Sequence, residues 1–473
     1  MAKQAEDNGY PVQQESRYDT VGSTGTNVAD GFTVVAVGDL LTSRPLTNGR
    51  HPGFDDVVKI LQDADVTCGN VESNIFDIRS FTGSPQVSTD YVLSVPELGA
   101  DLKAMGFNVV SRANNHVFDW GIEGMRETSR VLDQNGIVHA GVGENLAQAS
   151  AARFLETGGG RVALLSFAST FQSMSPACDP AGEAPGRPGL NALRLSQSIV
   201  VLPEMMESVR RIRDALPGFK AGGNDPNRVV LGGATFRAGE EVGYSFEPDQ
   251  GHVENILRNI RRGKLSSDFC MVAHHGHGAG NWCQEPPDYE REFAHKLIDA
   301  GADAYIGHGP HQLRGIEIYK DRPIFYSLGN FMFDNLGTPV GAEMFATYGK
   351  DPHVHTDAEL IVDVMVKGFE GDGGFTNPVY YESIIAISRF EQNRLSELRL
   401  IPVELGYSGR FANRGVPRPA TPPQAQAILG RLQRLSEPFG TEIEIENDVG
   451  IIRLRGRDHR RMSAAIGSPG RTG

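Results

Sequence analysis

The chain has 473 residues, enough for one large domain or two of ordinary size, and a single large domain is favoured. Hydrophobic residues make up 39% of it, which is typical of a soluble globular protein. The formal net charge of -14 argues against nonspecific binding to nucleic acid or to an anionic membrane surface.

The N-terminal segment, residues 1–30, is polar and without periodicity, so a disordered arm is expected there. It has no apolar core of a signal peptide, and the chain has no run of about 18 apolar residues. A cytoplasmic protein with no membrane partner is therefore expected. The four cysteines show no tight spacing and are expected to be reduced thiols: Cys68, Cys178, Cys270 and Cys283.

From residue 32 onward, buried-type strands alternate with amphipathic stretches, which predicts βαβ units in an α/β domain over residues 31–415. The first half predicts strands at 32–39, 65–70, 108–113, 137–142 and 161–170, and helices at 54–63, 96–106 and 121–136. A Pro/Gly-rich loop at 171–194 is long enough to line or cover a pocket.

A charged helix at 204–215 precedes a Gly-rich insert around 216–251, which is interpreted as a hairpin or a lid. The βαβ pattern then resumes, with predicted helices at 252–263 and 287–301, strands at 267–275 and 302–309, and a hairpin-like pair at 315–334. Residues 359–368, 382–390 and 395–405 are expected to be strands. Residues 416–473 are assigned to a C-terminal helix at 422–435 and a basic tail.

Polar residues stand where several of these strands should end. Asp39 follows the first strand, and Gly38 before it is expected to let the backbone turn. Asn70 and Glu72 lie two residues apart, so both can face one side of an extended segment, although an Asx turn explains the pair equally well. Strand ends of an α/β sheet share one crevice, so a common site is expected.

The segment ANNHVFDWG, residues 113–121, is more specific. Asp119 lies three residues after His116, within reach of its ring, and a carboxylate on one ring nitrogen raises the basicity of the other. Trp120 could line the pocket of such a site or belong to the core.

Five histidines crowd two further strand ends, namely His274, His275, His277, His308 and His311. Their number predicts that at least two of them bind a metal or transfer protons. Arg44 and Arg112 flank the first and third motifs, and either one could bind a substrate anion or pair with a local carboxylate.

Taken in order, these motifs resemble the CapA family, the poly-γ-glutamate capsule synthesis proteins, whose fold is similar to calcineurin-like metallophosphoesterases. The resemblance covers residues 32–335 and is carried by GDLLTSR, GNVES, ANNHVFDWG, the HHG loop and GHGPH followed by PIFYSLGNFMFD. It implies an α/β fold, a calcineurin-like β-sandwich flanked by helices.

The resemblance also implies a ligand set. Its metal neighbourhood comprises Asp39, Glu72, Asn115, His274 and His311 or His308, with Asn70, His275, Arg44, Arg112 and Trp120 as expected substrate contacts. The phosphoesterase pattern has a histidine two residues after its first Asp, where this chain has Leu41, so one metal position loses a ligand and a single ion is expected in place of a two-metal centre. Oxygen-rich ligation favours Mg²⁺, Mn²⁺ or Ca²⁺ over zinc.

The preferred functional hypothesis is a metal-dependent enzyme that epimerises a Cα centre of a peptide substrate, as lasso-peptide epimerases similar to this family do. His116 with Asp119 would serve one face of the Cα centre, and His308 or His311 with Asp39 the other. Two alternatives are a metal-dependent hydrolase of phosphoester or amide bonds and a poly-γ-glutamate capsule biosynthesis protein. The family's capsule proteins are typically membrane-attached, whereas this chain has no anchor-like run.

Overall fold

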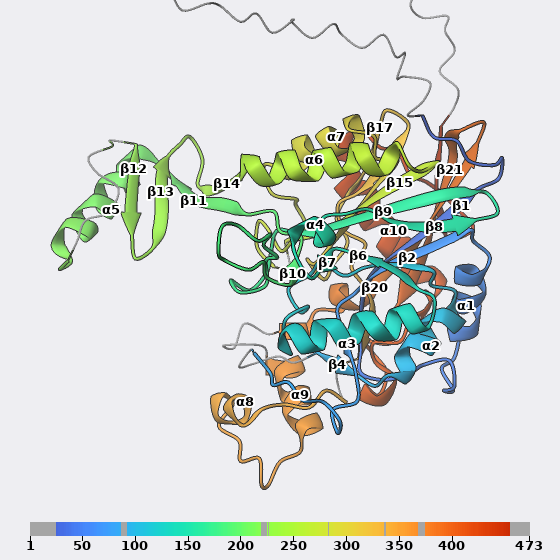
Figure 1. The fold of residues 1–473 in the computed structure, drawn as a ribbon, viewed down its shortest axis with the longest axis horizontal. Coiled ribbons are helices and arrows are strands. Elements are labelled where there is room, and N and C mark those ends of the chain that lie inside the picture. Colours follow the sequence, from blue (N-terminus) through green and yellow to red (C-terminus); the bar gives the residue numbers. More distant parts are fainter. Residues whose placement is uncertain are drawn as a thin grey trace, which may run out of the picture.

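A computed structural model describes residues 25–86, 92–218, 225, 227–281, 283–334, 337–367 and 374–454. Two β-sheets pack face to face, and helices cover their outer sides, with α3 and α6 on opposite sides of the layered body (Figure 1). The predicted α/β sandwich flanked by helices is confirmed.

The larger sheet has the order β23-β24-β21-β20-β1-β2-β5-β6, with β19 paired to β1 and β22 paired to β21. The strands β1, β2, β5 and β6 run parallel, so their carboxyl ends meet at one edge. Its strands are β1 (Thr33–Thr42), β2 (Val66–Val71), β5 (Val109–Ser111), β6 (Val138–Ala140), β19 (Asn330–Asp334), β20 (Glu382–Glu391), β21 (Arg394–Glu404), β22 (Arg418–Pro419), β23 (Glu444–Glu446) and β24 (Val449–Arg453).

The smaller sheet has the order β17-β18-β16-β15-β9-β8, and its central strands β9, β15, β16 and β18 are also parallel. Its strands are β8 (Arg153–Thr157), β9 (Gly160–Ala168), β15 (Phe269–His275), β16 (Ala304–His308), β17 (Ile316–Tyr319) and β18 (Arg322–Phe325). Two short pairs join β3 (Asn74–Ile75) to β4 (Leu93–Ser94) and β7 (Val142–Gly143) to β10 (Gly189–Leu190).

Strand alternation builds the layers. On β1, Val34 and Ala36 belong to the core between the two sheets, whereas Val35 and Val37 face the helices outside. The outer helices are α1 (Phe54–Gln62), α2 (Glu97–Met105) and α3 (Gly121–Gln134) on the larger sheet, with α6 (Gln250–Lys264) and α7 (Glu290–Asp299) on the smaller one. Each helix buries one apolar face, as Phe54, Val57 and Leu61 of α1 illustrate.

Three further helices are α4 (Leu146–Ala149), α8 (Ala342–Thr347) and α10 (Pro422–Ser436). The 3-10 turns are η2 (Gly374–Thr376), η3 (Pro378–Tyr381), η4 (Phe411–Asn413) and η5 (Glu437–Phe439). Helix α10 packs into the core between the sheets, and β22 to β24 extend the larger sheet. Residues 416–454 therefore share the main core, although a separate C-terminal region was expected. The predicted basic tail from 455 onward lies outside the described residues.

The predicted insert around 216–251 is part of a larger arm that projects from the body (Figure 1). It consists of α5 (Pro203–Ala215) and a four-stranded sheet of β11 (Leu195–Val201), β12 (Arg228–Leu231), β13 (Ala234–Ala238) and β14 (Gly243–Pro248). Val201, Met206 and Val229 form a small core of its own.

Two further expectations, about a strand and about the N-terminal arm, differ from the structure. Residues 359–368 were expected to form a strand, but α9 (Asp357–Lys367) is a helix, because Leu360, Ile361, Val364 and Met365 recur at helical spacing and pack together. The N-terminal arm was expected to reach residue 30, but Val28 is buried in the main core. Residues 1–24 lie outside the described residues. None of the described helices combines the length and apolar character that a membrane crossing requires.

Candidate metal centre

The carboxyl ends of strands from both sheets bring the predicted motifs together. Asp39 on β1 lies in register with Asn70 on β2 and with Asn330 on β19. The register of β1 shifts relative to β2 before Asp39 and relative to β19 after it. Irregular strand pairing of this kind changes the direction of a side chain beside a site.

Gly38 is required here for a reason other than the one the sequence suggested. A Cβ at Gly38 would lie 1.8 Å from the carbonyl oxygen of Gly329, so only glycine permits this close approach. Asp39 N donates to that same oxygen at 2.9 Å, which holds the carboxylate in place.

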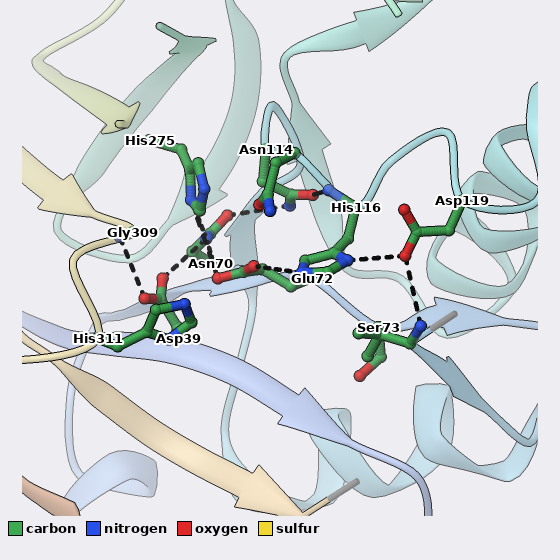
Figure 2. A network of polar contacts seen from close by, with 12 residues as sticks. Asp39, Asn70, Glu72, Ser73, Asn114, His116, Asp119, His275, Gly309 and His311 are labelled. Carbon is green, nitrogen blue, oxygen red and sulfur yellow. Dashed lines mark hydrogen bonds and ion pairs between the residues drawn. The ribbon is translucent and has the colours of Figure 1, made fainter. Parts of the chain in front are cut away.

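Asp39, Glu72 and His275 form the candidate metal group. One ligand atom from each lies within 4.8 Å of the others, and all three residues are buried. Asn70 lies between them, and its Nδ2 is 2.9 Å from Asp39 Oδ1, 3.2 Å from Glu72 Oε1 and 3.1 Å from His275 Nδ1 (Figure 2).

The charges of this group favour a cation. Burial raises the pKa of Glu72 well above its ordinary value, and the charge of Asp39 adds to the rise. Glu72 Oε2 makes no hydrogen bond to any described residue. A divalent ion among these side chains would offset the repulsion between the two carboxylates and occupy that oxygen, so the donor set fits a cation.

The histidines of the centre are suited to bind as neutral rings. Burial, together with the charge of His277, lowers the pKa of His275 well below its ordinary value. Burial and the charge of His311 lower the pKa of His277 to about 3. Burial raises the pKa of Asp39, but the contacts with His308, His275 and His311 together outweigh it, so this pKa lies below its ordinary value. Asp39 is therefore charged, and His275 and His277 are neutral, at pH 7.

His116 and Asp119 form the predicted pair beside this group. His116 Nδ1 lies 2.7 Å from Asp119 Oδ2, and His116 Nε2 lies 3.8 Å from Glu72 Oε2. Figure 2 shows the ring of His116 between the two carboxylates. Asn114 supports the loop, because its Oδ1 accepts from His116 N at 3.1 Å and its Nδ2 donates to the carbonyl of Val71 at 2.8 Å.

Two further histidines approach Asp39 from β16 and the loop after it. His308 Nδ1 lies 3.4 Å from Asp39 Oδ1, and both ring nitrogens of His308 lack hydrogen bonds to described residues. Gly309 N donates to Asp39 Oδ2 at 3.1 Å. His311 has a positive φ of 58° and lies beside Asp39 in Figure 2, with its Nδ1 2.8 Å from Asn330 Oδ1.

His274 is a correction to the predicted ligand set. On β15, Met271 and Ala273 face the core between the sheets, so His275 points to that side and His274 to the opposite side. His274 lies 2.6 Å from the hydroxyl of Tyr305 and takes no part in the metal group. His275, expected to contact substrate, occupies the ligand position.

The other predicted contacts are placed as follows. Asn115 Oδ1 is buried without a hydrogen bond to a described residue, so its predicted ligand role stays a prediction. Arg44 pairs with Asp334 at 2.7 Å. Trp120 is buried against Phe76 and Phe81 in a core cluster, which is the second of its two predicted places.

Arg112 corrects the remaining anion-binding prediction. Arg112 is 1% exposed. The preceding residue, Ser111 of β5, contacts Ser166 between the two sheets. Because successive side chains of a strand point to opposite faces, Arg112 lies toward the helix-covered side. Burial lowers the pKa of Arg112 to about 9. A side chain so enclosed does not present its charge to a substrate.

Sequence reasoning missed three contributors. Asn114 stood next to the predicted Asn115, Asn330 lay in the quoted segment PIFYSLGNFMFD, and Gly309 acts through its backbone N–H. The available signal for Asn330 was the pair Gly-Asn after an apolar run, because this repeats the pattern in which Asn70 stands.

Several known proteins are similar in sequence to this chain. The chain is 60% identical over 461 residues to the Sinorhizobium fredii protein y4sH, covering 96% of this chain and 100% of that protein. It is 24% identical to the capsule biosynthesis protein CapA of Bacillus anthracis, covering 71% of this chain and 66% of the relative. It is 26% identical to the PGA biosynthesis protein CapA of Bacillus subtilis, covering 64% of each.

A solved structure, the NAD nucleotidase of Haemophilus influenzae, matches with a TM-score of 0.30 and 11% identity, covering 85% of this chain and 56% of that one. This likeness is too weak to support an argument. The model of the bacterial capsule synthesis protein family PGA_cap matches residues 33–335, which contain Asp39, Glu72 and His275 of the candidate metal group. The chain therefore belongs to the PGA_cap family of bacterial capsule synthesis proteins.

Proposed function

We propose that this protein binds one divalent cation, Mn²⁺ or Mg²⁺ by its donor set, and acts on a poly-γ-glutamate chain or a related glutamyl peptide. The observation that supports this most directly is the buried group of Asp39, Glu72 and His275 with His116 beside it. Two carboxylates and one imidazole suit these hard ions better than a structural zinc site.

The names of two relatives support the substrate class, and the net charge of the protein explains why a cation would be needed to bind it. Two relatives carry names of capsule or PGA biosynthesis proteins. A polyglutamyl chain is an anion, and this protein has a net charge of -14, so the two repel each other at long range. A bound cation would supply the local positive charge that brings a glutamyl carboxylate or carbonyl to the strand ends.

The residues around the group supply proton transfer. Asp119 is an acceptor for His116 Nδ1, so the neutral ring carries its proton there and Nε2 is the ring nitrogen that can take one up. The cation, when bound, would polarise a carbonyl oxygen. His116 would then hold or move a proton beside that carbonyl, as required for hydrolysis of a glutamyl amide.

Epimerisation at Cα is the second candidate reaction. It requires a proton-transferring group on each face of the Cα centre, and two histidines here each have a carboxylate neighbour. These are His116 with Asp119 and His308 with Asp39. The same pairs could therefore remove and return a Cα proton.

One experiment separates the candidates. Purified protein, freed of metal and reloaded with Mn²⁺, is incubated with poly-γ-glutamate in D₂O. Release of free amine with shorter chains supports hydrolysis, deuterium at Cα with unchanged length supports epimerisation, and Mn²⁺-dependent binding without turnover supports an accessory role in assembly. Absence of Mn²⁺-dependent binding to the polymer contradicts the proposal, and His353→Gln, at an exposed histidine, serves as the matched control for His116→Gln.

A further inference from the structure

A second cluster of reactive groups lies on the helix-covered face of the smaller sheet. Ser169 Oγ is 2.8 Å from His274 Nε2, and the other ring nitrogen, His274 Nδ1, is 2.6 Å from the hydroxyl of Tyr305. Glu290 Oε1 lies 3.4 Å from His274 Nδ1. A hydroxyl, an imidazole and a carboxylate in this order form the arrangement that activates a serine nucleophile.

The hydrogen bonds determine which nitrogen of His274 carries the proton. The Tyr305 hydroxyl donates to Glu290 Oε1 at 2.6 Å, so its oxygen can only accept from His274 Nδ1. The neutral ring is therefore protonated at Nδ1, and Nε2 is the acceptor for the Ser169 hydroxyl. This is the tautomer that a general base for Ser169 requires.

The surroundings hold this pair, and Ser169 lies nearer the surface than its partners. His274 and Glu290 are 2% and 3% exposed, whereas Ser169 is half-buried. The Ser169 hydroxyl packs directly against Gly276, because a Cβ there would lie 2.4 Å from Ser169 Oγ, so glycine is required for this approach. Arg314 Nη1 lies 3.5 Å from Glu290 Oε2, which balances the buried carboxylate.

The cluster is separate from the metal centre. His274 and His275 are neighbours on β15, and successive side chains of a strand point to opposite faces of the sheet. His275 therefore faces the metal group, while His274 stacks on Phe167, which belongs to the core under α6 and α7.

We propose that Ser169 is the nucleophile of a second, metal-independent site that transfers or hydrolyses acyl groups of esters or amides. Ser169 Oγ bonds to the acyl carbon as its proton passes to His274 Nε2. His274 returns that proton to the departing alcohol or amine as the bond to the acyl carbon breaks. Water then attacks the acyl-serine by the same route, releasing the carboxylic acid and restoring Ser169. Tyr305 and Glu290 are positioning residues that hold the ring.

A fluorophosphonate ester tests this on the full-length protein, because its phosphorus bonds to an activated serine oxygen and releases fluoride. Mass spectrometry of the digested protein locates and times the adduct. One adduct is expected, on Ser169, with EDTA present or absent. It should be absent from Ser169→Ala, about 100-fold slower or more in His274→Gln, and unchanged in Ser129→Ala, where a half-buried serine of α3 is removed.

The contrary results are equally specific. Wild-type protein with a native unfolding transition that gains no adduct on Ser169 overturns the proposal, as does a His274→Gln variant that reacts at the wild-type rate. Ser169→Ala removes only a half-buried hydroxyl, and its thermal unfolding curve shows whether the fold is kept. Because the reaction needs no metal, its failure leaves the proposed metal-dependent function untouched, and the reverse also holds.

Discussion

His116 Nδ1 lies 2.7 Å from Asp119 Oδ2, and this contact connects the metal group to the Asp119 carboxylate. Two other segments of the chain donate hydrogen bonds to that carboxylate. Asp119 Oδ2 also accepts from Val92 N at 3.3 Å, and its Oδ1 accepts from Gln172 Nε2 at 3.0 Å. The orientation of the His116 ring therefore depends on three separate parts of the chain.

We expect Asp119→Asn to lower any proton-transfer activity at the centre by about 10² to 10⁴, because an amide no longer enforces the Nδ1–H form of His116. Turnover of the glutamyl substrate measures the loss, and ¹⁵N chemical shifts of the ring report the tautomer. Mn²⁺ affinity should change by less than about tenfold. An unchanged tautomer together with unchanged turnover contradicts this role.

Substitution of His275 or Asp39 should remove the cation. In wild type, Mn²⁺ at about 100 times its Kd should stabilise the fold by about 2.7 kcal/mol. His275→Gln and Asp39→Asn should weaken Mn²⁺ binding by about 100-fold or more in titration calorimetry, and the rise in Tm should disappear. His353→Gln, at an exposed histidine, should behave as wild type. Full affinity in His275→Gln contradicts the assigned ligand.

Glu72→Gln should stabilise the metal-free fold at pH 8 but not at pH 4. The folded pKa of Glu72 lies above its ordinary value of 4.5, so the unfolded chain ionises first as pH rises. Wild type therefore loses stability from about pH 4.5 up to the folded pKa, and the amide avoids that loss. Unfolding in EDTA should show a gain of about 1–3 kcal/mol at pH 8, and a lower Tm there contradicts the prediction.

Gly38→Ala should destabilise the fold and weaken the metal centre together. The added Cβ would lie 1.8 Å from the carbonyl oxygen of Gly329, and separating the two strands costs about 1–3 kcal/mol. Asp39 N bonds to that same oxygen, so Mn²⁺ affinity should fall as well. Gly158→Ala is the control, because a Cβ there meets nothing within 4 Å. Equal Tm values for the two variants contradict the argument.

The thiols should react in an order set by burial. Cys178 is exposed and Cys283 half-buried, whereas Cys68 and Cys270 are buried. Burial raises the pKa of Cys68 to about 12, which removes its thiolate at neutral pH. Iodoacetamide followed by peptide mapping should modify Cys178 first and Cys68 only in urea. Early modification of Cys68 in the folded protein contradicts the described packing.

Much of the fold was predictable because its elements carry local signals. The parallel strands before Asp39 and Asn70 are continuous apolar runs, and α1, α3 and α10 have one apolar face and recognisable ends. The strand predicted at 359–368 was wrong. Its β-branched residues favour a strand, but the packing of Leu360 and Val364 in one apolar cluster selects the helix. Local composition does not report which neighbour a side chain will meet.

For the site, the sequence alone determined which strand ends carry the candidate site residues, since Asp39, Glu72 and His116 each follow an apolar run and such ends share an edge. Only the tertiary structure decided between His274 and His275. Neighbouring residues on a strand face opposite sides of the sheet. Which of the two histidines faces Asp39 depends on how the two sheets pack against each other and on the irregular pairing of β1. Those contacts join residues more than two hundred positions apart, so no local pattern encodes them.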